Sequence, residues 1–381
     1  MPFGVYVHVP FCAARCGYCD FNTYTASELA GSGASPDGWL EAVYRELELA
    51  ASTVGSRPVD TVFVGGGTPS LIGAERLGAV LAAIRSTFGL ADGAEVTTES
   101  NPESTSPEFF GGLVEAGFTR VSLGMQSAAS HVLAVLDRQH RPERAVAAVA
   151  EAHAAGFEHV NLDLIYGTPG ESDRDWQASL DAAIGSGADH LSAYALIVEE
   201  GTPLARKVAS GAIPAPDDDL LADRYLQADE TLTAAGFGWY EVSNWARSAA
   251  ARSVHNRLYW SGANWWGAGP GAHSHVGGVR WWNVKHPARY AGLLDAGRSP
   301  AAGRETLDSA AELTERVMLQ LRMSDGLALA GLPAAAIRHA EQCVRWGLAE
   351  RQPLSDGRLV LTLRGRLLAD AVARDLLLTV G

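Results

Sequence analysis

Three of the four cysteines in this chain lie within eight residues, at Cys12, Cys16 and Cys19, in a C-x3-C-x2-C pattern. Structural zinc prefers four tetrahedral ligands, so it would need His8 or a distant side chain as the fourth. A redox C-x2-C pair would use Cys16 and Cys19 and leave Cys12 without a role. An iron–sulfur cluster held by three thiolates uses all of them and leaves one iron open to a small molecule. The spacing favours the cluster and leaves the other two interpretations open.

Composition sets the class of protein and excludes several partners. The 381 residues are 47% hydrophobic and 19% charged, which indicates a globular protein of two or three domains. Its longest apolar runs fall short of a membrane span, and no signal peptide is expected, so we predict a cytoplasmic protein without an integral membrane segment. The net charge of −14 disfavours a nucleic-acid partner and an anionic bilayer.

Short apolar runs alternate with helical periodicity through the first 200 residues, which predicts a parallel sheet with right-handed crossovers. Helices are expected over 39–51, 74–88, 107–116 and 143–155. The six candidate strands are VYVHV (5–9), TVFVG (61–65), EVTTE (95–99), RVSLG (120–124), HVNLDLIYG (159–167) and HLSAYAL (190–196). A doubly wound sheet and a barrel are both compatible with this alternation.

Polar residues at the strand ends favour the barrel. Cys12 follows the first strand, Gly65–Thr68 follow the second, Glu99 ends the third, Gln126 follows the fourth and Asp163 lies in the fifth. In (β/α) barrels that rim carries the active site. We therefore predict an α/β fold built on a partial, TIM-like (β/α)6 barrel.

The pattern changes after residue 200. Asp217–Asp219 are expected to begin a helix, and 236–290 are rich in Gly, Trp and Asn. From Glu305 onward we expect three helices, a hairpin turning at Ser355-Asp356-Gly357 and a last helix, which together suggest a small winged-helix-like domain. The predicted units are 1–235, a connecting region 236–300, and 301–381.

The cysteine pattern, directly after the first strand of a βα repeat, resembles the signature of the radical S-adenosylmethionine (radical SAM) superfamily. The resemblance implies that the thiolates hold a [4Fe–4S] cluster and that S-adenosylmethionine chelates the fourth iron. Nearly the whole chain resembles the branch that contains oxygen-independent coproporphyrinogen III oxidase. The blocks that carry this likeness are, in order, VYVHVPFC, FVGGGTPS, TESNP, RVSLGMQS, LDRQH and NLDLIYGTPG.

Carried over residue by residue, the resemblance implies a cofactor shell. Carboxylates suit an amino group or ribose hydroxyls, whereas arginine and glutamine suit carboxylate and amide contacts. Taken singly, the carboxylates could instead pair with a buried cation, and the arginine could lie on a helix surface. The implied shell is Tyr6, Tyr18, Gly66, Gly67, Thr68, Glu99, Gln126, Arg138 and Asp163.

Two features of the sequence depart from the oxidase, and a third feature favours a different branch of the superfamily. Phe21 replaces the oxidase's fourth cysteine, and only eleven residues precede Cys12, where the oxidase has a sizeable segment that helps to enclose the porphyrin. The run from His255 to Tyr259 fits the H-N-x-x-Y motif of the HemW-like proteins, which are regarded as haem chaperones. That resemblance implies a haem ligand at His255, with Tyr259 as a second ligand or hydrogen-bond partner.

The expected function is therefore binding of haem and its transfer to an unidentified haem acceptor, which we expect to be a respiratory or other haem protein. Oxidative decarboxylation of coproporphyrinogen III, a related radical SAM methyltransferase and a zinc-stabilised structural domain remain alternatives. Trp260, Trp265 and Trp266 could wall a porphyrin or simply pack between domains. His273 is a weaker candidate, and Cys343, on an apolar helical face, is assigned no function.

Overall fold

The computed structural model describes residues 2–55, 57–138 and 141–379. Its centre is a run of six parallel strands that pair in sequence order, as predicted. These strands alternate apolar and polar residues along most of their length, which places apolar side chains on one face of the sheet and polar side chains on the other. They are β1 (Phe3–Val9), β2 (Val59–Gly66), β3 (Leu90–Ser100), β4 (Arg120–Gln126), β5 (His159–Tyr166) and β6 (His190–Ala195).

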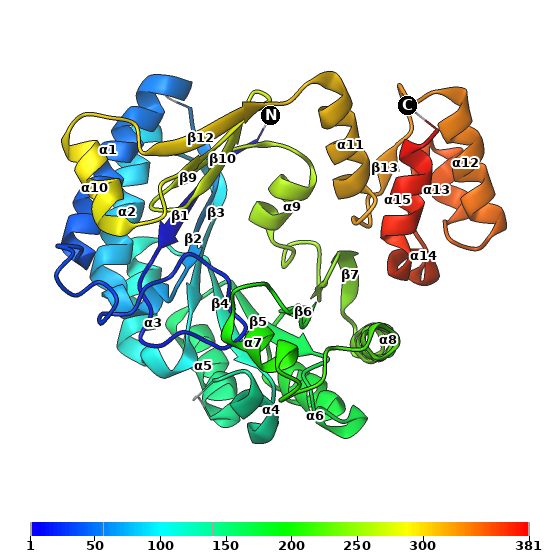
Figure 1. Ribbon diagram of the computed structural model, residues 1–381, viewed down its shortest axis with the longest axis horizontal. Helices are drawn as coiled ribbons and strands as arrows, with labels where there is room; N and C mark the ends of the chain where they lie inside the picture. Colours follow the sequence, from blue (N-terminus) through cyan, green and yellow to red (C-terminus); the bar gives the residue numbers. More distant parts are fainter. Residues whose placement is uncertain (1, 56, 139–140, 380–381) are drawn as a thin grey trace.

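Helices between these strands cover the outer face of the curved sheet (Figure 1). Ser35 caps the first by accepting a hydrogen bond from Gly38 N (3.1 Å), and Asp217 caps α8 by accepting one from Leu220 N (2.9 Å), which confirms the predicted helix start there. The helices are α1 (Pro36–Val54), α2 (Gly73–Phe88), α3 (Pro107–Ala116), α4 (Ser130–Val135), α5 (Pro142–Ala155), α6 (Asp173–Gly185), α7 (Pro203–Ala209) and α8 (Asp218–Ala234).

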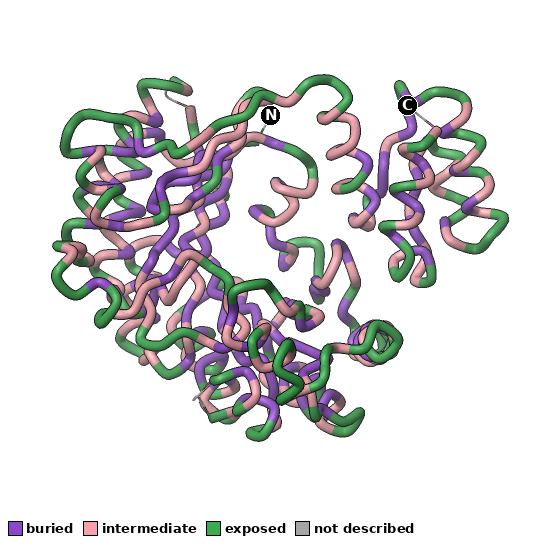
Figure 2. Tube along the Cα trace, viewed as in Figure 1, coloured by how far each residue is buried: buried purple, intermediate pink, exposed green. Residues whose placement is uncertain are grey.

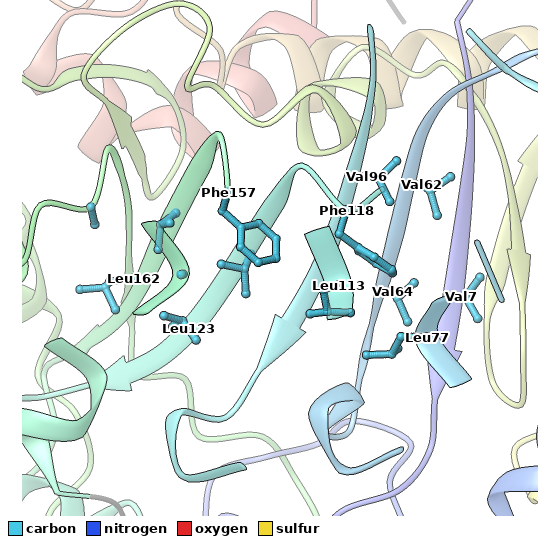
Figure 3. Packing of buried hydrophobic residues seen from close by; sticks show 14 of the residues in the cluster. Val7, Val62, Val64, Leu77, Val96, Leu113, Phe118, Leu123, Phe157 and Leu162 are labelled. Atoms are coloured by element: carbon cyan, nitrogen blue, oxygen red, sulfur yellow. The ribbon is translucent and has the colours of Figure 1, made fainter. Parts of the chain in front are cut away.

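The main core lies between the sheet and this helical layer. Figure 3 shows Val62 and Val64 of β2 and Val96 of β3 beside Leu77 of α2 and Leu113 of α3. All five are at most 1% exposed, and Figure 2 shows the strands buried while the outer faces of the helices are exposed. Burial of alternate strand residues against helices is the expected stabilising layer of an α/β fold.

The sheet continues beyond the six strands at both edges, through residues that the sequence left irregular. At one edge β9 pairs in parallel with β1, and β10, β11 and β12 follow antiparallel; at the other, β8 and β7 follow β6. Two short helices belong to the same region, and α9 packs on the inner side of β1 and β2 (Figure 1). These elements are β7 (Gly238–Glu241), β8 (Asn244–Ala246), α9 (Val254–Trp260), β9 (Asn264–Ala268), β10 (His273–Val276), β11 (Val279–Asn283), α10 (Pro287–Asp295) and β12 (Ala301–Thr306).

The C-terminal residues form a second, smaller core around Val317, Leu327 and Leu359. Figure 1 places its last helices together at one side of the molecule. Its elements are α11 (Ser309–Gln320), β13 (Leu327–Ala328), α12 (Ala334–Arg345), α13 (Arg351–Ser355), β14 (Arg358–Leu359), α14 (Leu363–Leu367) and α15 (Ala369–Leu377). No helix in the described part of the chain combines the length and apolar character needed to cross a bilayer.

The hairpin predicted at Ser355-Asp356-Gly357 is wrong. Residues 351–355 are helical, and β14 pairs with β13 rather than with a strand across the turn. Asp356 is the C-cap of α13, and Gly357 follows with φ of 76°, the left-handed conformation that commonly ends a helix. The Asp-Gly signal was real, but it marks a helix end.

Candidate functional site

The loop after β1 carries the three neighbouring cysteines and is held by backbone hydrogen bonds. Cys12 N donates to the Tyr24 carbonyl (3.0 Å), which closes the loop on itself. Gly17 N donates to the Leu136 carbonyl (3.2 Å), which fastens the loop to the end of α4. The loop therefore lies across the carboxyl ends of the parallel strands, the rim on which the sequence placed it.

The thiols of this loop lie beside hydrogen-bond donors. Cys12 Sγ is 3.6 Å from Thr68 Oγ1, and Arg138 Nη1 donates to Cys16 Sγ (3.4 Å). Burial raises the pKa of Cys12, and it raises the pKa of Cys19 to about 11. A metal bound by these thiols would displace their protons, and Thr68 and Arg138 are placed to stabilise the resulting thiolates.

The arrangement does not match a site for a single metal ion. Within 2–55, 57–138 and 141–379, no three His, Cys, Asp or Glu side chains are grouped as ligands of one ion. All four cysteines are free, so the Cys16–Cys19 pair is not a disulfide. The loop offers three free thiols as donors. Three thiol donors fit an iron–sulfur cluster that has one open iron.

The glycine-rich segment after β2 runs directly under the cysteine loop. Gly67 N donates to the Val9 carbonyl (2.7 Å), and Thr68 N donates to the Phe11 carbonyl (2.8 Å). A Cβ on Gly67 would lie 2.5 Å from the carbonyl oxygen of Phe11, and Gly66 has a φ of 110°. Glycine is required here because the two backbones approach closely.

Two partly buried carboxyls lie on β3 and β5, the strands on either side of β4. Glu99 accepts a hydrogen bond from Gly66 N (2.9 Å), and burial raises its pKa to about 7. Asp163 accepts hydrogen bonds from Ser122 Oγ and Asn161 Nδ2 (both 2.8 Å), and burial raises its pKa as well. Both side chains are therefore held in fixed orientations, with oxygens available to a cationic or hydroxyl group.

The end of β4 is bent so that its polar side chains turn into the barrel. Gln126 has a φ of 65°, and the register between β4 and β5 shifts between Gly124 and Gln126. Arg138 Nη2 donates to the Gly124 carbonyl (3.1 Å). A Cβ on Gly124 would lie 2.8 Å from Gln126 Nε2 and 3.0 Å from Arg138 Nη2, so glycine makes room for both side chains.

These groups line one cavity of about 690 Å³, called here the cysteine cavity. It brings together all but three of the residues that the sequence proposed for the site. Gln139 and His140 of the LDRQH block lie outside the described residues. The proposed residues that line the cavity are Cys12, Cys16, Tyr18, Cys19, Gly66, Gly67, Thr68, Glu99, Gln126, Arg138 and Asp163.

A second cavity, of about 610 Å³, adjoins the first and is called here the Tyr259 cavity. Phe21, Gly66 and Glu99 line both cavities, so the two meet at these residues. Tyr6 and Tyr259 line only this second one, so Tyr6 shares a cavity with Gly66 and Glu99 but not with the other residues of the predicted cofactor shell. Its walls are largely aromatic and aliphatic, and they come from the sheet, the cysteine loop and α11.

His255 of the H-N-x-x-Y motif is buried behind this cavity rather than on its wall. Its Nδ1 is 2.5 Å from Thr61 Oγ1 and its Nε2 is 2.8 Å from Tyr259 OH. The ring stacks on Phe63, with centroids 5.2 Å apart, and burial lowers its pKa to about 3. The imidazole is therefore neutral, and both ring nitrogens are engaged. Of the motif residues 255–259, only Tyr259 lines the cavity.

Comparison with known proteins agrees with this site. The sequence model of the radical SAM superfamily matches residues 6–183. The haem chaperone HemW of Mycobacterium tuberculosis is 59% identical over 376 residues, which cover 99% of this chain and 95% of that protein. HemW of Bacillus subtilis is 31% identical over 373 residues, 96% of this chain and 97% of that protein. The chain belongs to the HemW family.

The fold of this HemW-family chain also has a solved counterpart. Coproporphyrinogen III oxidase (HemN) from Escherichia coli, described as a radical SAM enzyme, superposes with a TM-score of 0.82. The match covers 98% of this chain and 90% of that one at 22% identity, so it shows a shared fold. The predicted α/β radical SAM architecture is therefore confirmed.

Sequence reasoning missed several residues that shape the HemW-family site. Ser122 and Asn161 orient Asp163, and His8 is hydrogen-bonded to Tyr6 (Nδ1 to OH, 3.0 Å). In β5, Asn161 is two residues before Asp163 and so shares its side of the strand. The alternation that pairs Asn161 with Asp163 can be read from the sequence. The contact with Ser122 on the neighbouring strand can be identified only when the register of β4 and β5 is known.

Proposed function

We propose that this HemW-family chain is a haem chaperone, which binds haem and transfers it to a haem-acceptor protein. The observation that carries the proposal is the Tyr259 cavity of about 610 Å³. Its size falls in the usual range for small-molecule sites, and its walls are mostly apolar with a few polar groups, as a porphyrin with two carboxylates requires. The names of the two curated relatives, both haem chaperones, support the same conclusion.

We further propose that Cys12, Cys16 and Cys19 hold a [4Fe–4S] cluster and that S-adenosylmethionine binds in the cysteine cavity. The superfamily match and the three free thiols support this assignment. Glu99 and Asp163 offer oxygens to an amino group or ribose hydroxyls, whereas Arg138 and Gln126 suit a carboxylate. Such a cluster supplies an electron to the sulfonium; this chain's residues position the cofactor.

Within the H-N-x-x-Y motif, we propose that Tyr259 contacts the haem and that His255 fixes its phenol. Tyr259 lines the cavity, and its hydroxyl is 2.8 Å from His255 Nε2. The sequence predicts that His255 binds iron directly. To do so, His255 would have to break its hydrogen bond with Tyr259 and reach the cavity past that side chain. Trp265 lines the same cavity and packs edge-on against Tyr259, with ring centroids 4.7 Å apart. These two rings suit one face of a porphyrin.

For the remaining organisation, we propose the predicted units 1–235, 236–300 and 301–381, with a C-terminal winged-helix-like unit. Helices on both sides of the short β13–β14 pair support the likeness. Within the unit 301–381, β12 pairs with β11 of the main sheet, and the separate C-terminal core begins with α11. A cytoplasmic location remains a prediction that rests on reduced cysteines.

The experiment that tests the function is an anaerobic haemin titration of cluster-reconstituted protein, followed by transfer to an apo-haem protein such as apomyoglobin. We expect saturable binding and transfer faster than release of haem to buffer alone. Trp265→Ala should raise the Kd about tenfold, the size of losing one partly buried aromatic contact. Trp346→Ala, half-exposed in the C-terminal unit, is the matched control and should change nothing. Absence of saturable haemin binding by the wild-type protein would contradict the proposed function.

The shared fold with the oxidase HemN favours one second candidate, oxidative decarboxylation of coproporphyrinogen III. That reaction needs cleavage of S-adenosylmethionine to a 5′-deoxyadenosyl radical, which takes hydrogen from a propionate side chain. Coupled formation of 5′-deoxyadenosine and protoporphyrinogen would favour the oxidase over the chaperone.

A further inference from the structure

Three histidines line the Tyr259 cavity, and their ring nitrogens differ in what they bind. His8 uses both nitrogens, with Tyr6 OH 3.0 Å from Nδ1 and the Asn22 carbonyl 2.8 Å from Nε2. His275 uses only Nδ1, which lies 3.1 Å from the Ala263 carbonyl. Because a carbonyl can only accept, this hydrogen bond selects the tautomer that has its proton on Nδ1, in which Nε2 has the lone pair.

That lone pair has no partner within the described part of the chain. A neutral imidazole whose Nδ1–H is held by a backbone carbonyl has the tautomer and the fixed ring orientation that metal-ligating histidines use. The ring is further held by Trp265, whose centroid is 5.2 Å from its own. His275 therefore presents a pre-oriented nitrogen ligand at the cavity wall, which His255, with both nitrogens engaged, does not.

A cation stands next to His275 in the cavity wall. Arg280 lines the same cavity and is paired with His275 across the β10–β11 ladder. Its guanidinium forms ion pairs with Glu305 (2.7 Å) and with Glu315 of α11. Its Nε is buried and has no hydrogen-bond partner among the described residues. An unpaired buried donor costs free energy, which a carboxylate of the ligand would recover.

We propose that Nε2 of His275 is the axial ligand of haem iron in the Tyr259 cavity, with a haem propionate at Arg280. The inference rests on the proposed haem-chaperone function and adds the residue that binds the metal. No electron or atom is transferred: the imidazole lone pair forms a coordinate bond to iron, and the proton stays on Nδ1, which donates it in a hydrogen bond to the Ala263 carbonyl. Since the ligand lies on β10 beside α11, release of haem is expected to involve these two elements.

The test compares haemin with metal-free protoporphyrin IX on the full-length, cluster-reconstituted protein. His275→Ala should shift the Soret maximum of bound haemin and raise its Kd at least tenfold, and added imidazole should restore the wild-type spectrum. Metal-free protoporphyrin, which forms no axial bond, should bind His275→Ala and wild type within about twofold. That equality shows that the variant has kept its cavity, so loss of haemin binding cannot be ascribed to misfolding.

His273→Ala is the matched control. His273 lines the same cavity two residues away on the same strand, and in the described residues its ring has no hydrogen bond and stacks only on Trp282, 6.0 Å between centroids. We expect the wild-type Soret position in this variant. The proposal is overturned if wild type binds haemin saturably while His275→Ala keeps its Soret band and affinity. If wild type itself does not bind haemin, the chaperone function fails first.

Discussion

At the scale of residues, the chain sorts its cysteines by their surroundings. Cys12, Cys16 and Cys19 are partly exposed and stand beside donors, whereas Cys343 is 1% exposed in the C-terminal core. Arg138 lies at the cavity with its Nη1 donating to Cys16. A thiolate is stabilised by such a neighbour and is disfavoured in an apolar core, so only the first three are suited to bind iron.

Cys16→Ala is expected to lose the cluster, because three thiolates are the only protein ligands that the loop offers. Iron and sulfide content after anaerobic reconstitution, together with visible charge-transfer absorbance, measures this. Cys343→Ala is the matched variant: it should keep wild-type iron and sulfide and lose about 1 kcal/mol of stability for a small buried side chain. Unchanged iron and sulfide in Cys16→Ala would contradict the cluster assignment.

At the scale of elements, the site depends on two segments that cross with almost no space between them. The glycine-rich segment after β2 passes under the cysteine loop after β1, and Gly67 and Thr68 donate to carbonyls of that loop. Parallel pairing of β1 with β2 brings both strand ends to the same edge of the sheet. The register of these two strands therefore sets the distance between the thiols and the backbone groups that face them.

Gly67→Ala should disturb this crossing, because its Cβ would lie 2.5 Å from the Phe11 carbonyl oxygen and 2.9 Å from that of Val9. We expect about 1–3 kcal/mol of destabilisation and loss of most reconstituted iron. Urea unfolding and iron analysis measure the two effects. Gly111→Ala is the control: a Cβ in α3 would meet no atom within 4 Å. It should gain about 0.5–1 kcal/mol and reconstitute normally. Full cluster content in Gly67→Ala would show that the crossing tolerates a shift.

At the scale of the whole molecule, a partly buried ion pair joins the C-terminal unit to the barrel. Arg366 of α14 contacts both carboxylate oxygens of Asp229 in α8 (2.9 and 3.2 Å), and its guanidinium lies 4.2 Å from the centroid of Trp239. The two charged side chains are 10% and 11% exposed. Such a pair fixes the position of the unit, because removing one member leaves the other charge buried and unpaired.

Arg366→Ala is expected to lower stability by about 3 kcal/mol, since the Asp229 carboxylate would lose its cationic partner and keep only the neutral donor Trp245 Nε1 (3.0 Å). The C-terminal unit should also become more accessible to protease between β12 and α12. Urea unfolding and limited proteolysis provide the measurements. Arg364→Ala, exposed on the same helix, should stay within about 0.5 kcal/mol of wild type. Equal behaviour of the two variants would show that the ion pair does not hold the unit in place.

The sequence by itself determined the six parallel strands, the helices that follow them and eleven of the residues that gather in the cysteine cavity. The reason is that apolar periodicity sets each element, and parallel strands bring their carboxyl ends to one rim. Motif order then placed Cys12, Glu99 and Asp163 on that rim without any knowledge of distances.

Only the tertiary structure decided how far the sheet extends and which ring nitrogens are free. Strands β9 to β12 are short; β9 pairs with β1, which is far away in the sequence, and β10, β11 and β12 extend the sheet from β9. The Asp-Gly signal at 356–357 was read as a hairpin, because its role as a helix end depends on the residues before it. Likewise, His255 belongs to the H-N-x-x-Y motif, yet both of its ring nitrogens are engaged in hydrogen bonds, with Thr61 and Tyr259. His275 belongs to no motif; its Nδ1 is hydrogen-bonded to the Ala263 carbonyl, and its Nε2 has no partner among the residues that the structure describes. Long-range contacts of this kind leave no local pattern in the sequence.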